Sequence, residues 1–464
     1  MDVVDRAKNK FHSGRPAGNF GPPVSLFNRA LGLFDYHLSH LDDESSTVNL
    51  PPSLIQQAHI FMVVAANSYS NESMRTVAIK DILNSIFGMQ LNWDVSLNQF
   101  GIKPDAISFG DKPFFVVEVK NEAGLEGDAS LQAALSYAHI ATSILNHTAV
   151  HSNYPAVLYG IMGNLLEIGV AMYTDGVYSN ILFSERLRLD FFAEKNVLRF
   201  ARAFAATRQV IADLRVFYIT PLPASGSIAH LFPSPLQVPT CTDSLPSLTF
   251  TGRLSRSGET VVLAEGETMR QSGVYLATMP RPLSTDEDTV MSSTVEALAD
   301  RFKVVVKFTA QYHPEAHRLL ANEGLAPVLH ACVPVCGGLF MVVMNHVDGE
   351  TAWHAGNRGE LLPYDIYKDI KNAVELLHSK DLVFGDLRTP NIMVVPGGSG
   401  SDARRRGMLI DFDWVGAHGI GRYPASLDDG LPDWTSSGIQ RYGIMYKAHD
   451  LVMLDKFKQR CHPD

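Results

Sequence analysis

Two aspartates and an asparagine in the C-terminal part of the sequence have a spacing that suits phosphoryl transfer. Asp386 is followed five residues later by Asn391, and Asp411 lies in the apolar run MLIDFDW. An aspartate beside an incoming hydroxyl can orient it for attack, while an asparagine and a second aspartate can hold the magnesium ion that neutralises a triphosphate. The sequence therefore predicts a site for ATP and Mg²⁺, with Asp386 as the base and Asn391 and Asp411 as metal ligands.

These motifs resemble those of protein kinases, with two departures. Kinases usually have His-Arg-Asp and Asp-Phe-Gly where this chain has Phe384-Gly385-Asp386 and Asp411-Phe412-Asp413. The same residues are also similar to small-molecule phosphotransferases of the aminoglycoside and choline type. The resemblance implies an α+β bilobal, Ser/Thr protein-kinase-like domain, and it leaves open whether a protein or a small molecule supplies the accepting hydroxyl.

The kinase resemblance extends to a lysine ahead of these motifs. Residues 302–308, FKVVVKF, predict a strand, and Lys307 is expected to contact the nucleotide phosphates. An acidic partner for this lysine is expected on the helix predicted over 314–322. Glu315 is the first choice and Glu323 the second.

Further residues are expected to support the transfer site. Arg388 follows Asp386 by two residues and is placed to touch the transferring phosphate, because a guanidinium binds phosphate bidentately. Asp450, after His449 on the last predicted helix, either holds the backbone of the loop around Asp386 or lies at the surface. Two glycine pairs are candidates for the loop that covers the phosphates: Gly266 with Gly273, and Gly252 with Gly258.

A second set of charged residues lies in the segment PDAISFGDKPFFVVEVK, residues 104–120. The segment predicts a β-hairpin that turns at residues 110–113. Because side chains alternate between the two faces of a strand, Glu118 and Lys120 share a face, and Asp105 comes from the partner strand. Burying three charges there costs several kcal/mol unless they pair or bind a cation.

These residues resemble the PD-(D/E)XK nuclease superfamily. The resemblance implies an α/β restriction-endonuclease-like domain in which Asp105 and Glu118 bind Mg²⁺ and Lys120 orients or activates the attacking water for DNA cleavage. Two flanking residues match the family: Glu72, as an additional acidic metal ligand on the preceding helix, and Gln132, at the start of the following helix.

One position departs from the nuclease pattern. Some members have a tyrosine four residues after the glutamine, where this chain has Ser136, with Tyr137 next to it. The competing interpretation of the whole segment is a structural network of charges at a sheet edge. For the transfer site, the corresponding alternative is that Asp386 and Asn391 cap turns and Asp411 ends a strand.

Turn signals and composition divide the chain into two domains. Asn71 is a plausible N-cap for a helix that ends at Gly88. The segment 221–247 is rich in Pro, Ser and Thr, which is typical of a linker. The predicted organisation is an arm with one helix (1–50), a nuclease-like domain (51–220), the linker (221–247), and a kinase-like domain (248–464) with lobes at 248–347 and 348–464.

Composition restricts the environment and the partners. The four cysteines are too few and scattered for a disulfide framework, which favours an intracellular, reducing location in the cytoplasm or nucleus. No apolar run reaches the length of a membrane span. The formal charge of −10 means that contact with DNA would need a local basic patch or bound metal.

The two motif sets together resemble Crinkler-type effectors and related nuclease-kinase fusions of fungi and oomycetes. For an effector, the resemblance implies action in a host nucleus. Two other hypotheses stay open: a small-molecule phosphotransferase with a non-catalytic first domain, and a pseudokinase that senses nucleotide and regulates the nuclease.

Overall fold

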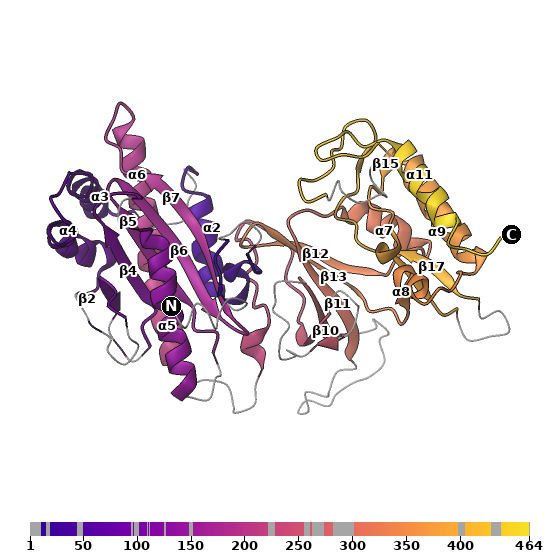
Figure 1. Cartoon of the computed structure of the whole chain (residues 1–464), viewed down its shortest axis with the longest axis horizontal. Coiled ribbons are helices and arrows are strands. Elements are labelled where there is room, and N and C mark those ends of the chain that lie inside the picture. Colours follow the sequence, from indigo (N-terminus) through magenta and orange to yellow (C-terminus); the bar gives the residue numbers. More distant parts are fainter. Residues whose placement is uncertain are drawn as a thin grey trace, which may run out of the picture. The chain divides into compact units, whose positions relative to one another are not determined.

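The computed structural model forms two compact units of mixed α/β structure (Figure 1). The first contains the described residues up to Thr240 and Val335–Gly338, and the second contains the other described residues from Cys241 onward. The described residues are 11–14, 19–43, 50–93, 96, 102–108, 110, 112–124, 127–147, 152–220, 228–254, 260–261, 273–281, 301–397, 404–427 and 438–463.

The first unit is built on a seven-stranded sheet in the order β1-β7-β6-β5-β4-β3-β2. The β4–β5 and β1–β7 pairs are parallel, and the other pairs are antiparallel. The strands are β1 (Phe11–His12), β2 (Leu91–Trp93), β3 (Ala106–Ser108), β4 (Phe115–Lys120), β5 (Ala156–Met162), β6 (Leu165–Tyr173) and β7 (Val177–Arg186).

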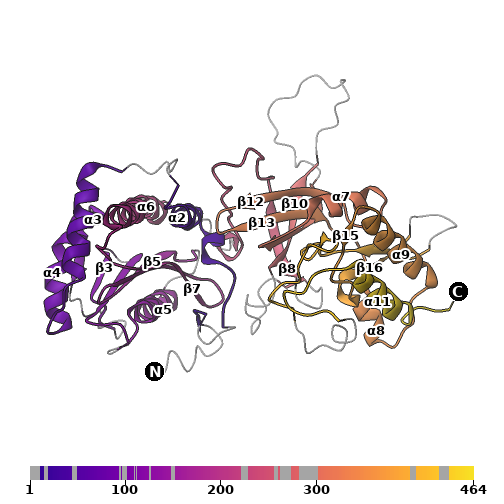
Figure 2. The same ribbon diagram turned by 90° about the horizontal axis from the view of Figure 1, so that it is seen from above.

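Helices cover both faces of this sheet. Helix α5 lies on one face, and α2, α3 and α6 lie on the other (Figure 2). All six residues of β4 are consequently buried, charged ones included. The helices are α2 (Arg29–Ser39), α3 (Pro52–Ala65), α4 (Glu72–Phe87), α5 (Ala129–His147) and α6 (Ala193–Ile219), with the short helices η1 (Val24–Phe27) and η2 (Ala229–Leu231).

Helix α4 begins and ends where the sequence predicts. The Asn71 side chain accepts a hydrogen bond from the Met74 N–H at 2.9 Å, and Gly88 ends the helix with a left-handed φ of 63°. This φ favours a residue without a Cβ. The two signals fix Glu72 in the first turn of α4.

The second unit begins with a six-stranded sheet in the order β12-β13-β11-β10-β8-β9. Its strands are β8 (Thr249–Leu254), β9 (Thr260–Val261), β10 (Val274–Pro280), β11 (Arg301–Thr309), β12 (Leu329–Val335) and β13 (Leu339–Asn345), and α7 (Pro314–Asn322) follows β11. Lys303, Val305 and Lys307 alternate with the fully buried Val304 and Val306, as the strand pattern predicts.

The rest of the second unit packs around one apolar core. Helix α9 (Tyr364–Ser379) contacts β17 (Arg406–Leu409), α7 and α11 (Lys447–Lys458). Buried residues of α9, including Ile366 and Ile370, belong to the same cluster as Phe384 and Phe412. The remaining elements are β14 (Glu350–Thr351), α8 (Ala352–Asn357), β15 (Leu382–Val383), η4 (Thr389–Asn391), β16 (Ile392–Val395) and β18 (Gly416–Ala417).

Candidate functional sites

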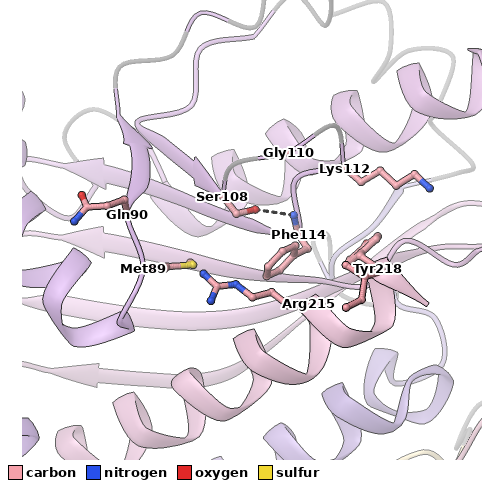
Figure 3. A pocket seen from close by; sticks show the side chains of 9 residues that line it. Met89, Gln90, Ser108, Gly110, Lys112, Phe114, Arg215 and Tyr218 are labelled. Atoms are coloured by element: carbon pink, nitrogen blue, oxygen red, sulfur yellow. Dashed lines mark hydrogen bonds between the residues drawn. The ribbon is translucent and has the colours of Figure 1, made fainter. Parts of the chain in front are cut away.

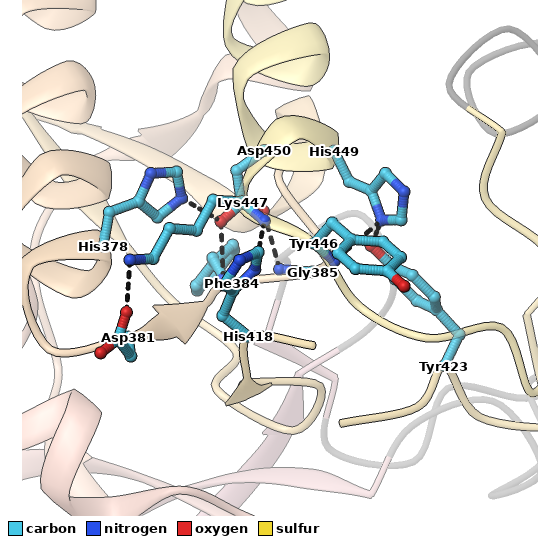
Figure 4. Close-up of polar contacts among 10 residues, drawn as sticks. All are labelled: His378, Asp381, Phe384, Gly385, His418, Tyr423, Tyr446, Lys447, His449 and Asp450. Carbon is cyan, nitrogen blue, oxygen red and sulfur yellow. Dashed lines mark hydrogen bonds and ion pairs between the residues drawn. The ribbon is translucent and has the colours of Figure 1, made fainter. Parts of the chain in front are cut away.

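The loop that carries Asp386 is held by a buried carboxylate on α11. The Phe384 and Gly385 N–H groups donate to Asp450 at 2.8 and 3.0 Å, and Nε2 of His378 lies 3.0 Å from the same carboxylate (Figure 4). Asp450 is 1% exposed. The predicted role of Asp450 in holding this backbone is therefore confirmed.

Gly385 permits the tight path of this loop. Its φ is 79°, and a Cβ at this position would lie 2.3 Å from the Met445 side chain. A larger residue would meet backbone strain at this φ and would have to displace the end of the Met445 side chain. Glycine here explains part of the departure from the usual kinase tripeptide.

Asp386 is buried and paired with Arg388. Nη2 of Arg388 lies 2.8 Å from Oδ2 of Asp386, and its Nε donates to Oδ1. Burial raises the pKa of Asp386 above its usual value, although Arg388 opposes the shift. The structure thus places Arg388 on both carboxylate oxygens of Asp386.

Asn391 is oriented by the same loop. Its amide nitrogen donates to the Asp386 carbonyl at 3.0 Å, so its side-chain oxygen is the atom that could act as a ligand. The Asn391 carbonyl accepts a hydrogen bond from the Ile410 N–H at 3.0 Å, next to Asp411. These bonds connect the asparagine to both aspartate motifs.

Lys307 of β11 reaches the second motif from a distant part of the sequence. Its Nζ lies 2.7 Å from Asp411 Oδ1 and 2.8 Å from Asp413 Oδ2. Burial disfavours the charged lysine, but the two carboxylates outweigh it and raise the pKa of Lys307. Thr309 donates to Asp413 Oδ2 at 2.8 Å.

The two aspartates differ in charge preference. Burial disfavours ionised Asp411, but Lys307 outweighs this effect and lowers its pKa. Burial and the neighbouring Asp411 raise the pKa of Asp413 to about 6. Asp413 was not assigned a role from the sequence; its position in the Asp-Phe-Asp tripeptide was the available signal.

An aromatic stack fixes the backbone at Asp411. Its φ of 69° is unusual for a residue other than glycine. The next residue, Phe412, stacks on His317 of α7 with ring centroids 4.5 Å apart and meets Phe384 edge-on at 5.7 Å. The stack joins α7, the Asp386 loop and the Asp411 loop.

The structure does not bring the predicted acidic partners to Lys307. The Glu315 side chain is 73% exposed and lies 3.4 Å from His313 Nδ1, and Glu323 is exposed. Because His313 caps the start of α7, Glu315 in the first turn stays close to His313. Asp411 and Asp413 neutralise Lys307 instead, so the Lys307–Glu315 prediction is corrected.

The predicted phosphate-covering glycines lie only partly within the described residues. Gly252 is in β8 opposite Leu276, and Gly273 directly precedes β10. Gly258 and Gly266 are outside the described residues. The choice between the two pairs stays a prediction.

In the first unit, the hairpin of β3 and β4 brings the predicted nuclease-like residues together. Oδ2 of Asp105 accepts the Val119 N–H at 2.7 Å, and the carboxyl groups of Asp105 and Glu118 lie close enough to shift each other's pKa. Lys120 is also close enough to influence both carboxyl groups electrostatically. Glu118 and Lys120 are 1% and 9% exposed.

Burial dominates the electrostatics of this cluster. Burial, with a contribution from Asp105, raises the pKa of Glu118 to about 8, and burial also raises the pKa of Asp105. For Lys120, burial favours the neutral amine, but Glu72 and the other acids outweigh this and raise its pKa. At neutral pH the two carboxyl groups therefore hold a proton between them.

The three flanking residues have different positions. Oε2 of Glu72 accepts from Lys120 Nζ at 3.0 Å, so Glu72 contacts the lysine rather than the two carboxyl groups. Gln132 lies in the first turns of α5, four residues before Ser136. Tyr137 is buried and donates to the Tyr154 carbonyl at 2.6 Å, which is a structural contact.

Each site offers two oxygen ligands suited to Mg²⁺: Asn391 with Asp411, and Asp105 with Glu118. Magnesium keeps several waters and is commonly held by one or two carboxylates together with substrate phosphates. Within the described residues, no group of three or more His, Cys, Asp or Glu side chains is arranged to hold a metal ion. In each site, two protein ligands could hold Mg²⁺ if oxygens of the substrate phosphates complete its coordination.

A separate cavity of about 450 Å³ lies in the first unit near the start of β4 (Figure 3). There Ser108 accepts a hydrogen bond from the Phe114 N–H at 3.0 Å, and Lys112 and Arg215 also line the cavity. None of the candidate site residues lines it.

Among the described residues, no helix has the length and apolarity needed to cross a membrane.

Comparisons with known proteins give no family. No protein-family model matches the sequence, and no curated protein matches it. Among solved structures, the kinase PK-1 of the Cydia pomonella granulovirus is 15% identical, with a TM-score of 0.29 over 46% of this chain and 67% of that chain. A TM-score this low does not establish a common fold, so the proposed function rests on the geometry of the two sites.

Proposed function

We propose that the second unit is an ATP- and Mg²⁺-dependent phosphotransferase with a protein-kinase-like fold. One observation carries this proposal: three separate segments form one connected network, with Lys307 on β11, Asp386 and Asn391 in one loop, and Asp411 in another. A lysine, an amide oxygen and two acids are the groups that nucleotide-dependent phosphoryl transfer requires.

Each residue of this site has a separate proposed role. Lys307 would bind the nucleotide phosphates, and Asn391 and Asp411 would hold Mg²⁺, which would neutralise the charge of the triphosphate. Asp386 accepts the proton of the attacking hydroxyl and orients it. Arg388 leaves one oxygen of Asp386 when the hydroxyl binds and contacts the transferring phosphate.

The test is transfer of labelled phosphate from ATP to a protein mixture and, separately, to small alcohols. We expect Mg²⁺-dependent transfer by the wild type and at least a 100-fold loss in Asp386→Asn. The matched control is Asp381→Asn, because Asp381 is exposed and its side chain pairs with Lys447 at the surface. Equal transfer by wild type and Asp386→Asn would refute the role of Asp386, and the labelled acceptor identifies the substrate class.

We propose for the first unit a Mg²⁺-dependent nuclease activity on DNA. The gathering of Asp105, Glu118 and Lys120 on buried backbone favours it. Asp105 and Glu118 would hold the cation, which would supply an activated water; Lys120 would orient that water, and Glu72 positions the lysine. The wider resemblance to Crinkler-type nuclease-kinase fusions stays part of this proposal.

Plasmid cleavage in the presence of Mg²⁺ tests this activity. Glu118→Gln should abolish cleavage, whereas Glu122→Gln, which changes a half-exposed glutamate nearby, should cut like the wild type. Cleavage that survives Glu118→Gln would exclude this site.

A further inference from the structure

Each carboxyl group of the nuclease-like site has one oxygen held by a protein donor. Oδ2 of Asp105 accepts the Val119 N–H at 2.7 Å, and Oε1 of Glu118 accepts the Ser136 hydroxyl at 2.8 Å. The second oxygen of each group is left for a shared proton or cation. The two donors differ in origin, because one is backbone of β4 and the other is a side chain of α5.

We infer that Ser136 is a positioning residue that orients Glu118 toward the cation of the proposed nuclease site. This inference rests on the proposed nuclease function. Carboxylates that bind a metal are commonly oriented by a hydrogen bond to their other oxygen, and loss of such a bond typically weakens metal binding roughly 10–100-fold.

The behaviour of Ser136 within its helix supports this role. Serine and threonine hydroxyls inside helices commonly donate to the carbonyl four residues earlier. Thr142 of the same helix follows this pattern and donates to the Ala138 carbonyl at 2.7 Å. Ser136 donates across to Glu118 on β4 instead.

Close packing of α5 on the sheet makes this contact possible. Gly160 of β5 lies opposite Glu118 in the sheet register, and a Cβ there would lie 2.2 Å from Oγ of Ser130 in α5. The missing side chain lets α5 approach the sheet beside Glu118. At this distance the short side chain of Ser136 reaches the carboxylate, and both residues are buried.

The bond also has an energetic consequence. Without the hydroxyl, a buried carboxylate oxygen of Glu118 loses a donor, and a buried acceptor left unpaired is costly. The side chain can then rotate away from Asp105. The change should therefore appear first in the affinity for the cation, before any loss of the fold.

Direct cation binding tests the inference, with titration calorimetry of Mg²⁺ and Mn²⁺ on the full chain. All proteins carry Asp411→Asn, so that the candidate cation site of the second unit does not contribute. Ser136→Ala should raise the Kd about 10–100-fold, and Ser136→Cys, which keeps the volume with a weak donor, should do the same. Ser136→Thr should restore binding to within about threefold, and Thr142→Ala should leave it unchanged.

The outcomes separate this inference from the function on which it rests. If Glu118→Gln abolishes cation binding but Ser136→Ala leaves the Kd unchanged, the role of Ser136 is wrong and the proposed nuclease site is retained. If the Asp411→Asn parent protein shows no cation binding that depends on Glu118, the proposed nuclease site is wrong as well.

Discussion

Buried carboxyl groups define both candidate sites, and each has its charge set by a small number of named contacts. In the first unit, burial raises the pKa values of both Asp105 and Glu118, and repulsion from Asp105 adds to the shift of Glu118, so the pair holds a proton. In the second unit, Lys307 stabilises Asp411 as an anion beside a less acidic Asp413. A cation can replace the proton in the first pair, which predicts linked effects of pH and Mg²⁺.

Glu118→Gln should change the pH dependence of stability. Because the folded-state pKa of Glu118 is raised to about 8, ionising it costs wild-type stability as pH rises from about 4.5 through 8. The glutamine variant avoids this loss and should gain stability relative to wild type by up to about 5 kcal/mol near pH 9. Thermal unfolding at about pH 5 and pH 9 measures the effect.

At high pH, Mg²⁺ should restore part of the stability that the wild type loses, because the cation replaces the shared proton. Mg²⁺ should not stabilise Glu118→Gln in this way. Glu122→Gln is the control with a wild-type profile. Parallel pH profiles for wild type and Glu118→Gln would contradict the raised pKa.

The sequence predicts which site residues lie together when those residues belong to one regular strand or are joined by a short loop. The two-residue period of β4 correctly placed Glu118 and Lys120 on one face, and the hairpin brought Asp105 to them. The partner of Lys307 was missed because it depends on where α7 starts relative to β11. The Ser136 contact depends on the depth of α5 packing, which spacing along the chain does not reveal.

At the scale of elements, helices α7 and α11 support the two motifs of the proposed transfer site. Helix α11 supplies the Asp450 carboxylate to the Asp386 loop, and α7 supplies the His317 ring beneath Phe412. Both contacts join segments that are far apart in the sequence. Damage to either helix should therefore affect catalysis without removing a reacting group.

Asp450→Asn should loosen the Asp386 loop. The amide has one acceptor oxygen where the carboxylate receives two backbone N–H groups, so at least one buried donor loses its partner. We expect a loss of about 2–4 kcal/mol of stability and at least a tenfold fall in phosphate transfer. Unfolding and transfer assays measure both; Asp455→Asn, on the exposed side of α11, should match wild type.

His317 should make the second unit sensitive to acid. Burial lowers its pKa to about 4, and both ring nitrogens are engaged, with Tyr312 and with the Pro327 carbonyl at 2.7 Å. Protonation favours the unfolded chain, so stability should fall by up to about 3 kcal/mol as pH drops from 6.5 to 4. His317→Phe should flatten this slope, while exposed His330→Phe should retain it. An unchanged slope in His317→Phe would contradict this assignment.

Element boundaries followed from local chemistry more reliably than element pairing. The Asn71 cap and Gly88 end of α4 were predicted correctly because each acts within one helical turn. The pairing of β1 with β7, more than 160 residues apart, has no local signal and was not predicted. Long-range strand order depends on packing of whole layers.

At the scale of the whole molecule, each candidate site is assembled within one compact unit. The nuclease-like residues belong to the first unit and the transfer residues to the second. We therefore predict that the two activities can be removed separately. Glu118→Gln should abolish plasmid cleavage and keep phosphate transfer, whereas Asp411→Asn should abolish transfer and keep cleavage.

Both assays on the same preparations of wild type and the two variants measure this separation. Loss of cleavage in Asp411→Asn would favour instead the hypothesis that nucleotide binding regulates the nuclease.

Titration calorimetry of ATP measures whether Lys307, Asn391 and Asp411 form a site for magnesium-bound ATP. We expect binding only with Mg²⁺ present, weakened at least tenfold in Asp411→Asn and in Lys307→Met, and unchanged in the surface control Asp365→Asn. Absence of ATP binding by the wild type, or equal Kd values in all four proteins, would show that these three residues do not form an ATP site.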